Sequence, residues 1–166
     1  EDLGMVPDCV SWVMNELKIL SLEIQSMPKD PHVRFGHLSR NPYRSVCTIS
    51  SHDTPTLRQW WDEDWERTQA YYGEMLYRQP LPEWLPRDLV SRHLTSPSML
   101  CILTIQDWLS IDEKLRLKDE NAERINIPAN PHHYWRYRMH LNIEDLMANN
   151  DFVANISELI TQSGRK

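Results

Sequence analysis

Residues 45–57 read Ser-Val-Cys-Thr-Ile-Ser-Ser-His-Asp-Thr-Pro-Thr-Leu, and this stretch decides the fold class. Its first six residues are apolar or small, which predicts a short buried strand over residues 45–50. We expect a helix directly afterwards, with Thr54 as its N-cap and Pro55 at the first helical position, where the missing N–H costs nothing. His52 and Asp53 then lie at the carboxyl end of a strand, just before a helix, which is where β/α enzymes place their chemistry.

The composition is that of one ordinary folded domain. The chain has 166 residues, of which 40% are hydrophobic and 25% are charged, so it is long enough to bury a core. Its net charge of −6 argues against a nucleic-acid partner, because such binding depends on Lys and Arg that neutralise phosphates. No apolar run approaches the ~20 residues of a membrane span, so no membrane partner is expected.

The cysteines, histidines and glycines give no sign of a metal or cofactor. Cys9, Cys47 and Cys101 lie in apolar segments at wide spacing, which predicts small core residues in a reducing compartment and a cytoplasmic protein. His132 and His133 are adjacent, so their side chains point apart and no metal site is expected. The chain has only four glycines, and none forms a Gly-rich phosphate loop.

Strand and helix patterns alternate along the chain. The patterns predict strands over residues 19–25, 45–50 and 99–105. They predict helices over residues 7–17, from 55 to about 76, 87–94 and 151–162, with long loops over 27–42 and 106–131. At helical spacing, the tryptophans of residues 60–65 are expected to pack against the sheet rather than to stack on sugars. Alternation of this kind predicts an α/β fold with parallel strands, right-handed crossovers and no internal domain boundary.

Four motifs in order resemble the 4-α-glucanotransferases, the amylomaltase or disproportionating-enzyme family (glycoside hydrolase family 77). They are Glu1-Asp-Leu-Gly4, Ser51-His-Asp53, Ile105-Gln-Asp-Trp-Leu109, and Arg124-Ile-Asn-Ile-Pro128 running to Tyr134-Trp-Arg-Tyr-Arg138. The loop of residues 27–43 is similar to the plant cytosolic and related bacterial branch. The resemblance implies that residues 1–166 are a C-terminal fragment of a single catalytic domain, about the last three β/α units of a (β/α)8 TIM barrel.

The resemblance also implies roles for individual residues in a retaining double displacement, whose nucleophile and acid/base lie about 5–5.5 Å apart. Glu1 matches the acid/base, and Asp53 matches the carboxylate that stabilises the oxocarbenium-like transition state. His52 would donate to hydroxyls of the same sugar ring. Asp2 is expected to support Glu1 or to cap a helix. For His52 and Asp53, a turn-forming cap is the alternative reading.

Further substrate contacts are expected from the segments near the end of the chain. The candidate residues are Gln106, Asp107, Trp108, Asn126 and Trp135. Asn126 has a family counterpart that reaches the substrate cleft, and the two tryptophans are expected to contact sugars. A surface loop that only closes the barrel is the alternative for this region.

The family motif that carries the nucleophile, Arg-x-Asp, does not occur in this sequence. The resemblance implies that the intact protein transfers α-1,4-glucan segments to the 4-OH of glucose or another glucan. Because the motif is missing, we expect the isolated chain to be inactive. The alternatives are an α-glucan hydrolase, which needs no different carboxylates, and an inactive glucan-binding fragment. A three-stranded parallel sheet with open edges is also expected to self-associate.

Overall fold

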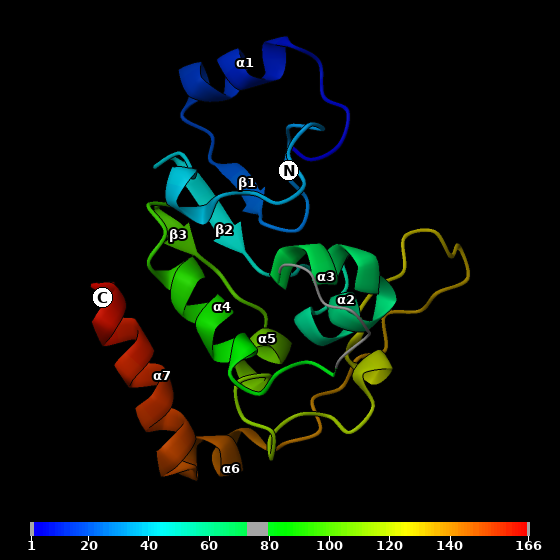
Figure 1. Ribbon diagram of the computed structural model, residues 1–166, viewed down its shortest axis with the longest axis vertical. Coiled ribbons are helices and arrows are strands. Elements are labelled where there is room, and N and C mark those ends of the chain that lie inside the picture. Colours follow the sequence, from blue (N-terminus) through cyan, green and yellow to red (C-terminus); the bar gives the residue numbers. More distant parts are fainter. Residues whose placement is uncertain (1, 73–79, 166) are drawn as a thin grey trace.

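A computed structural model describes residues 2–72 and 80–165, which include a small parallel sheet (Figure 1). The strands are β1 (Ser21–Ile24), β2 (Ser45–Thr48) and β3 (Leu100–Cys101), in the order β1-β2-β3. Ser21 pairs with Ser45 on one side of β2, and Cys47 pairs with Cys101 on the other. The prediction of three parallel strands is confirmed, although each strand is shorter than expected.

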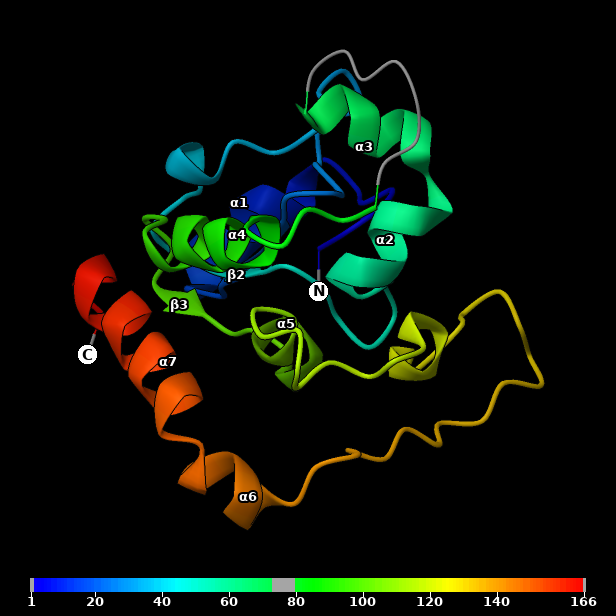
Figure 2. The ribbon, with the colours of Figure 1, turned by 60° about the horizontal axis from the view of Figure 1, so that its bottom comes forward.

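Helices and short helical turns fill the connections. They are α1 (Cys9–Leu17), the 3-10 turn η1 (Leu38–Arg40), α2 (Leu57–Glu63), α3 (Trp65–Tyr72), α4 (Leu85–Leu94), α5 (Ile105–Leu109), the 3-10 turn η2 (Glu120–Glu123), α6 (Ile143–Ala148) and α7 (Asn150–Ser163). In both ribbon views α4 crosses beside the sheet and α7 packs along α4 (Figures 1 and 2). Residues 124–142 form a long extended segment that leads from η2 to α6 (Figure 2).

The helix that follows β2 begins later than predicted. Thr56, not Thr54, is its N-cap, and it forms a capping box in which the Gln59 side chain accepts from the Thr56 N–H. Thr54 is not available for this role, because its hydroxyl accepts a hydrogen bond from the Ser51 N–H at 2.7 Å. The prediction of Thr54 as the cap is therefore wrong, and the tight turn after β2 is the physical reason.

Two further boundaries differ from the prediction. The helix expected from residue 55 to about 76 breaks at Asp64, whose carboxylate accepts from the Arg67 N–H at 3.0 Å and so caps α3. Its last expected residues, Met75 and Leu76, lie outside the described residues. The strand expected over residues 99–105 ends at Cys101, because Thr104 caps α5 by accepting from the Asp107 N–H.

The C-terminal helix matches the prediction closely. Phe152 and Leu159 are buried on its inner face, and Gly164, with φ 73°, ends it in the left-handed conformation. Arg165 follows and donates to the Leu94, Ser96 and Ser98 carbonyls at 2.5, 2.8 and 2.8 Å. These contacts tie the end of α7 to the turn between α4 and β3. The preceding helix α6 was not predicted.

Most of the buried apolar side chains fall into three clusters: Leu57, Trp61, Leu85 and Leu89; Val90, Leu94 and Leu159; and Leu109, Leu115 and Phe152. Trp61 is buried and Trp60 packs edge to face on Phe35, as predicted, whereas the third tryptophan of this block, Trp65, is exposed. Within residues 2–72 and 80–165, no helix has the length and apolar character needed to cross a membrane.

The cysteines occupy three different environments. Cys47 is fully buried and Cys101 is half-buried on the neighbouring strand, as expected of small core residues. The expectation of a core position for Cys9 is wrong, because Cys9 is exposed on α1, a helix with no fully buried residue.

Candidate functional site

A carboxylate and an imidazole lie together in the turn between β2 and α2. Nε2 of His52 lies 3.2 Å from Oδ2 of Asp53, and both side chains are open to solvent. The Asp53 N–H donates to the Ser51 hydroxyl at 3.2 Å, which holds the turn in shape. The alternative prediction was that Asp53 forms a cap, but Thr56 is the N-cap of α2. The Asp53 carboxylate is partly exposed to solvent.

A second loop brings Asn126 and Trp135 to this turn. The Asn126 side-chain amide donates to Oδ1 of Asp53 at 2.6 Å, and the Asn126 N–H donates to the His52 carbonyl at 3.1 Å. The exposed Trp135 indole lies beside the His52 ring, with ring centroids 5.1 Å apart and planes inclined by 39°. Four residues expected from the sequence are thus neighbours at the carboxyl end of β2.

The other expected substrate contacts lie inside the protein. Asp107 is fully buried and accepts from the Ser50 and Thr104 hydroxyls at 2.6 and 2.9 Å. Burial raises the pKa of this carboxyl, and the hydroxyl contacts offset that only in part. Gln106 is buried and donates to the Glu123 carbonyl at 3.2 Å. These positions do not favour a substrate contact.

Trp108 also belongs to the core rather than to the surface loop in which it was expected. Its ring packs against the clusters around Val90 and around Leu109. The cause is α5, which begins at Ile105 and turns residues 106–109 inward. The sequence carried a signal of this helix, since Thr104 and Asp107 have the spacing of an N-cap and its third helical residue.

Glu1, the expected acid/base, lies outside the described residues. Asp2 accepts from the Leu22 N–H of β1 at 2.8 Å and from the Lys29 ammonium at 2.7 Å. Burial raises the pKa of Asp2, but the Leu22 N–H and the Lys29 ammonium outweigh it and hold the pKa below its usual value. Lys29 also contacts Glu23 at 2.7 Å. No sequence pattern links Asp2 to Lys29, which follows it by 27 residues.

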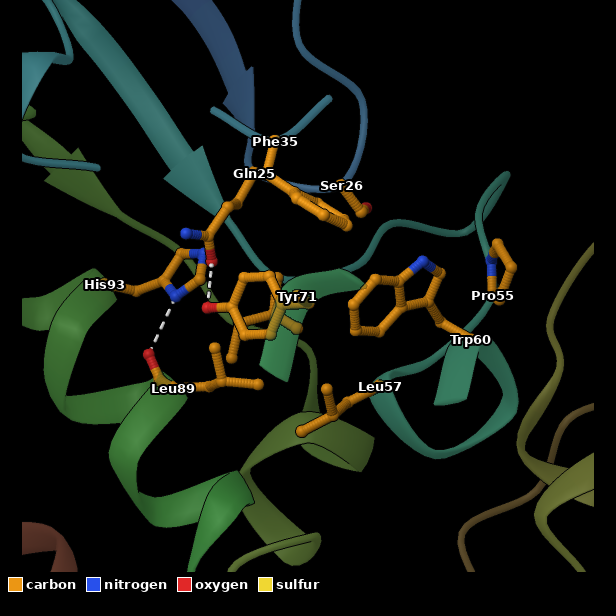
Figure 3. Close-up of a pocket in the computed structure, with 10 residues that line it drawn as sticks. Gln25, Ser26, Phe35, Pro55, Leu57, Trp60, Tyr71, Leu89 and His93 are labelled. Carbon is orange, nitrogen blue, oxygen red and sulfur yellow. Dashed lines mark hydrogen bonds between the residues drawn. The ribbon is translucent and has the colours of Figure 1, made fainter. Parts of the chain in front are cut away.

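A small cavity lies between the sheet and α4, with a volume of about 30 Å³ (Figure 3). Tyr71 donates to Oε1 of Gln25 at 3.1 Å on one side, and His93 donates from Nδ1 to the Leu89 carbonyl at 2.7 Å on the other. Burial lowers the pKa of His93 to about 4, so this ring is neutral near pH 7. The cavity has room for water but not for a sugar ring, so it is not a substrate cleft.

A carboxylate, an imidazole and an amide are thus gathered beyond the carboxyl end of a strand in a parallel sheet, the place where β/α proteins carry their active sites. Residues 1–143 match the 4-alpha-glucanotransferase family, glycoside hydrolase family 77, and the chain belongs to this family.

Individual relatives agree with this assignment. The 4-alpha-glucanotransferase DPE2 of Oryza sativa subsp. japonica is 40% identical over 170 residues, covering 99% of this chain and 18% of that protein. The 4-alpha-glucanotransferase of Chlamydia pneumoniae is 25% identical over 166 residues, covering 97% of this chain and 32% of that protein. The chain therefore spans less than a third of the length of these relatives.

A solved structure shows the same fold. Amylomaltase from Streptococcus agalactiae, in complex with acarbose, matches 99% of this chain and 31% of its own chain. The TM-score is 0.71 at 15% sequence identity. Because the identity is low, this likeness is evidence for the α/β fold with its parallel sheet, and the roles of individual residues depend on the site geometry.

Proposed function

We propose that the protein carrying this chain is a 4-α-glucanotransferase, which moves α-1,4-glucan segments to the 4-OH of glucose or another glucan by a retaining double displacement. The observation that carries the proposal is the Asp53 carboxylate at the carboxyl end of β2, held by the Asn126 amide in a chain of this family. The chain would supply about the last three β/α units of a (β/α)8 barrel, as one part of a single catalytic domain.

In this proposal Asp53 stabilises the transition state. Positive charge develops on the anomeric carbon of the oxocarbenium-like sugar, and a fixed carboxylate beside it lowers the barrier without having to reorient. The Asn126 amide holds Oδ1 of Asp53, which leaves Oδ2, on the His52 side, to face the sugar. His52 would contact the hydroxyls of the same ring, and the exposed face of Trp135 would pack on its carbons.

Glu1 would act as the acid/base in the same reaction. It would protonate the glycosidic O4 as the C1–O4 bond of the donor breaks, so that this oxygen leaves as a 4-OH, and it would then take the proton from the 4-OH of the acceptor. The Leu22 N–H of β1 donates to the carboxylate of Asp2. This hydrogen bond attaches Asp2, the residue next to Glu1, to the sheet and so supports the role of Glu1. The nucleophile would come from another part of the protein, because the chain has no Arg-x-Asp motif.

The three free cysteines accord with a cytoplasmic location.

The test is an Asp53→Asn variant of the full-length protein, incubated with maltotriose. We expect transfer to fall by roughly 10²–10³-fold, the loss seen when a fixed electrostatic group is removed from an active site. Glu1→Gln should lower transfer by roughly 10²–10⁴-fold, because it removes the acid/base. Asp151→Asn, which changes an exposed carboxylate on α7, is the matched control and should retain full activity.

The products, separated by length, distinguish the alternatives. A transferase makes both longer and shorter chains from maltotriose, whereas a hydrolase makes only shorter ones. Retention of more than half of the transfer activity by Asp53→Asn would overturn the role assigned to Asp53. Absence of any product from the native full-length protein would favour a glucan-binding protein instead.

A further inference from the structure

The loop that carries Asn126 is attached to α2 by a buried ion pair. Nη1 of Arg58, on α2, contacts Oε1 of Glu123, the last residue of η2, and these side chains are only 13% and 4% exposed. Oε2 of Glu123 accepts from the Thr56 hydroxyl at 3.0 Å. Arg58 also donates to the Leu117 carbonyl at 2.7 Å, so both charged groups have further hydrogen-bond partners.

The ion pair is close in sequence to both partners of the contact between Asp53 and Asn126. Glu123 precedes Asn126 by three residues, and the capped start of α2 at Thr56 follows Asp53 by three residues. The Arg58–Glu123 pair therefore joins the two loops whose tips carry the Asn126–Asp53 hydrogen bond.

Three more contacts fix the same loop. Arg124 donates from Nε to the Asn126 carbonyl at 2.7 Å, and its Nη1 lies 3.4 Å from Oε1 of Glu63 at the end of α2. On the other side, Gln106 donates to the Glu123 carbonyl at 3.2 Å. The backbone on both sides of Asn126 is thus held relative to α2 and α5.

Stability alone is a weak reason for burying this pair. Removing two charges from water costs free energy that their attraction often does not exceed, and apolar residues of similar volume can stabilise a core equally well. An ion pair with fixed hydrogen-bond geometry does, however, define the relative position of two loops more narrowly than apolar packing. At this place the loops in question carry Asp53 and Asn126.

We propose that Arg58 and Glu123 are positioning residues for glucan transfer: their buried ion pair holds Asn126 on Oδ1 of Asp53 and thereby aims Oδ2 at the substrate. This inference rests on the proposed function, because Arg58 and Glu123 have no contact with substrate in it and act only through Asn126 and Asp53. It predicts that loss of the pair and loss of the Asn126 amide damage the reaction through the same step.

A double-mutant cycle in the full-length protein tests this prediction. Asn126→Ala should lower kcat for maltotriose transfer by about 10-fold or more, the effect of losing a hydrogen bond to a charged group. Glu123→Gln should lower kcat by a similar factor with little change in KM. In the double variant, Glu123→Gln should add less than a twofold further loss, because the amide that it positions is already gone.

Independent effects would overturn the inference. If the two fold-losses multiply in the double variant, Glu123 acts elsewhere and supports the fold only. Arg58→Lys keeps a positive charge opposite Glu123, so its kcat should be higher than that of Glu123→Gln. If Glu123→Gln does not fold, Arg58→Lys and Asn126→Ala give a second double-mutant cycle. Glu158→Gln, which removes the carboxylate of the solvent-exposed Arg87–Glu158 pair, is the matched control and should stay within twofold of native activity.

The cycle also distinguishes failure of this inference from failure of the proposed function. If Asp53→Asn keeps native activity, the function assigned to the site fails, whatever the cycle gives. If Asp53→Asn and Asn126→Ala are both impaired but the cycle is multiplicative, the proposed function stands and only the positioning role of Arg58 and Glu123 fails.

Discussion

His93 should make the stability of the fold depend on pH. The ring lies between α4 and the sheet and is 1% exposed, and burial lowers its pKa from the ordinary 6.5 to about 4. Contacts with the backbone of Leu89 and Thr48 raise the pKa and offset this in part, whereas the nearby charge of Arg92 lowers it further. A substitution at His93 therefore tests how strongly the packing of α4 excludes the charged imidazole.

The sign follows from proton binding in the two states. Between about pH 6.5 and pH 4 the unfolded chain holds a proton on His93 that the folded chain does not. The free energy of unfolding must therefore rise with pH across this window, and the stability is lost as the pH falls from 6.5 toward 4. The difference of 6.5 − 4 pKa units, at 1.36 kcal/mol each, corresponds to about 3 kcal/mol.

The assay is urea unfolding followed by tryptophan fluorescence at pH 7.5, 6 and 4.5, at one fixed protein concentration. Between pH 7.5 and pH 4.5, the free energy of unfolding of the native chain should fall by about 2–3 kcal/mol more than that of His93→Gln. His32→Gln, the same substitution at an exposed position, is the control and should follow the native chain. Equal losses for the native chain and His93→Gln would refute the argument that burial keeps this imidazole neutral.

Two further predictions concern the isolated chain. It should not disproportionate maltotriose, because it lacks the nucleophile and no glycosyl intermediate can form; detection of longer maltooligosaccharides by chromatography would contradict this. It should also self-associate, because Leu100 on β3 and Ile102 just after it are exposed, and because the sheet has open edges among the described residues. Light scattering that gives a strict monomer at high micromolar concentration would show that the helices cover the sheet sufficiently.

The sequence predicted the parts of the fold and site that depend on local pattern. A buried strand that runs into a His-Asp turn placed His52 and Asp53 correctly at the end of β2. For Asn126 the family resemblance, not local pattern, implied a place in the substrate cleft, and the structure brings its amide to 2.6 Å from Oδ1 of Asp53. Local pattern suffices for His52 and Asp53 because strand ends and helix starts depend on a few adjacent residues.

Two kinds of error have physical causes. Gln106 and Asp107 were expected at the surface because an apolar strand pattern hides a short helix that begins with a capping threonine. Arg58 and Glu123 gave no signal at all, because they are 65 residues apart and either alone has the pattern of a solvated charge. Whether two charged residues are buried as a pair depends on tertiary packing. No local sequence pattern predicts that packing for residues so far apart.

The contacts of Arg165 have a consequence for the order in which the chain can fold during synthesis. Its carbonyl partners, Leu94, Ser96, Ser98 and Met99, leave the ribosome 66 to 71 residues before Arg165 does. Until then those carbonyls are hydrated, and the turn that leads into β3 lacks its final contacts. The Asp53, Asn126 and Trp135 contacts need no residue after 135, so they can form earlier. For a nascent chain that folds from its N-terminus, the turn before β3 can therefore gain its last contacts after the contacts of the candidate site have formed.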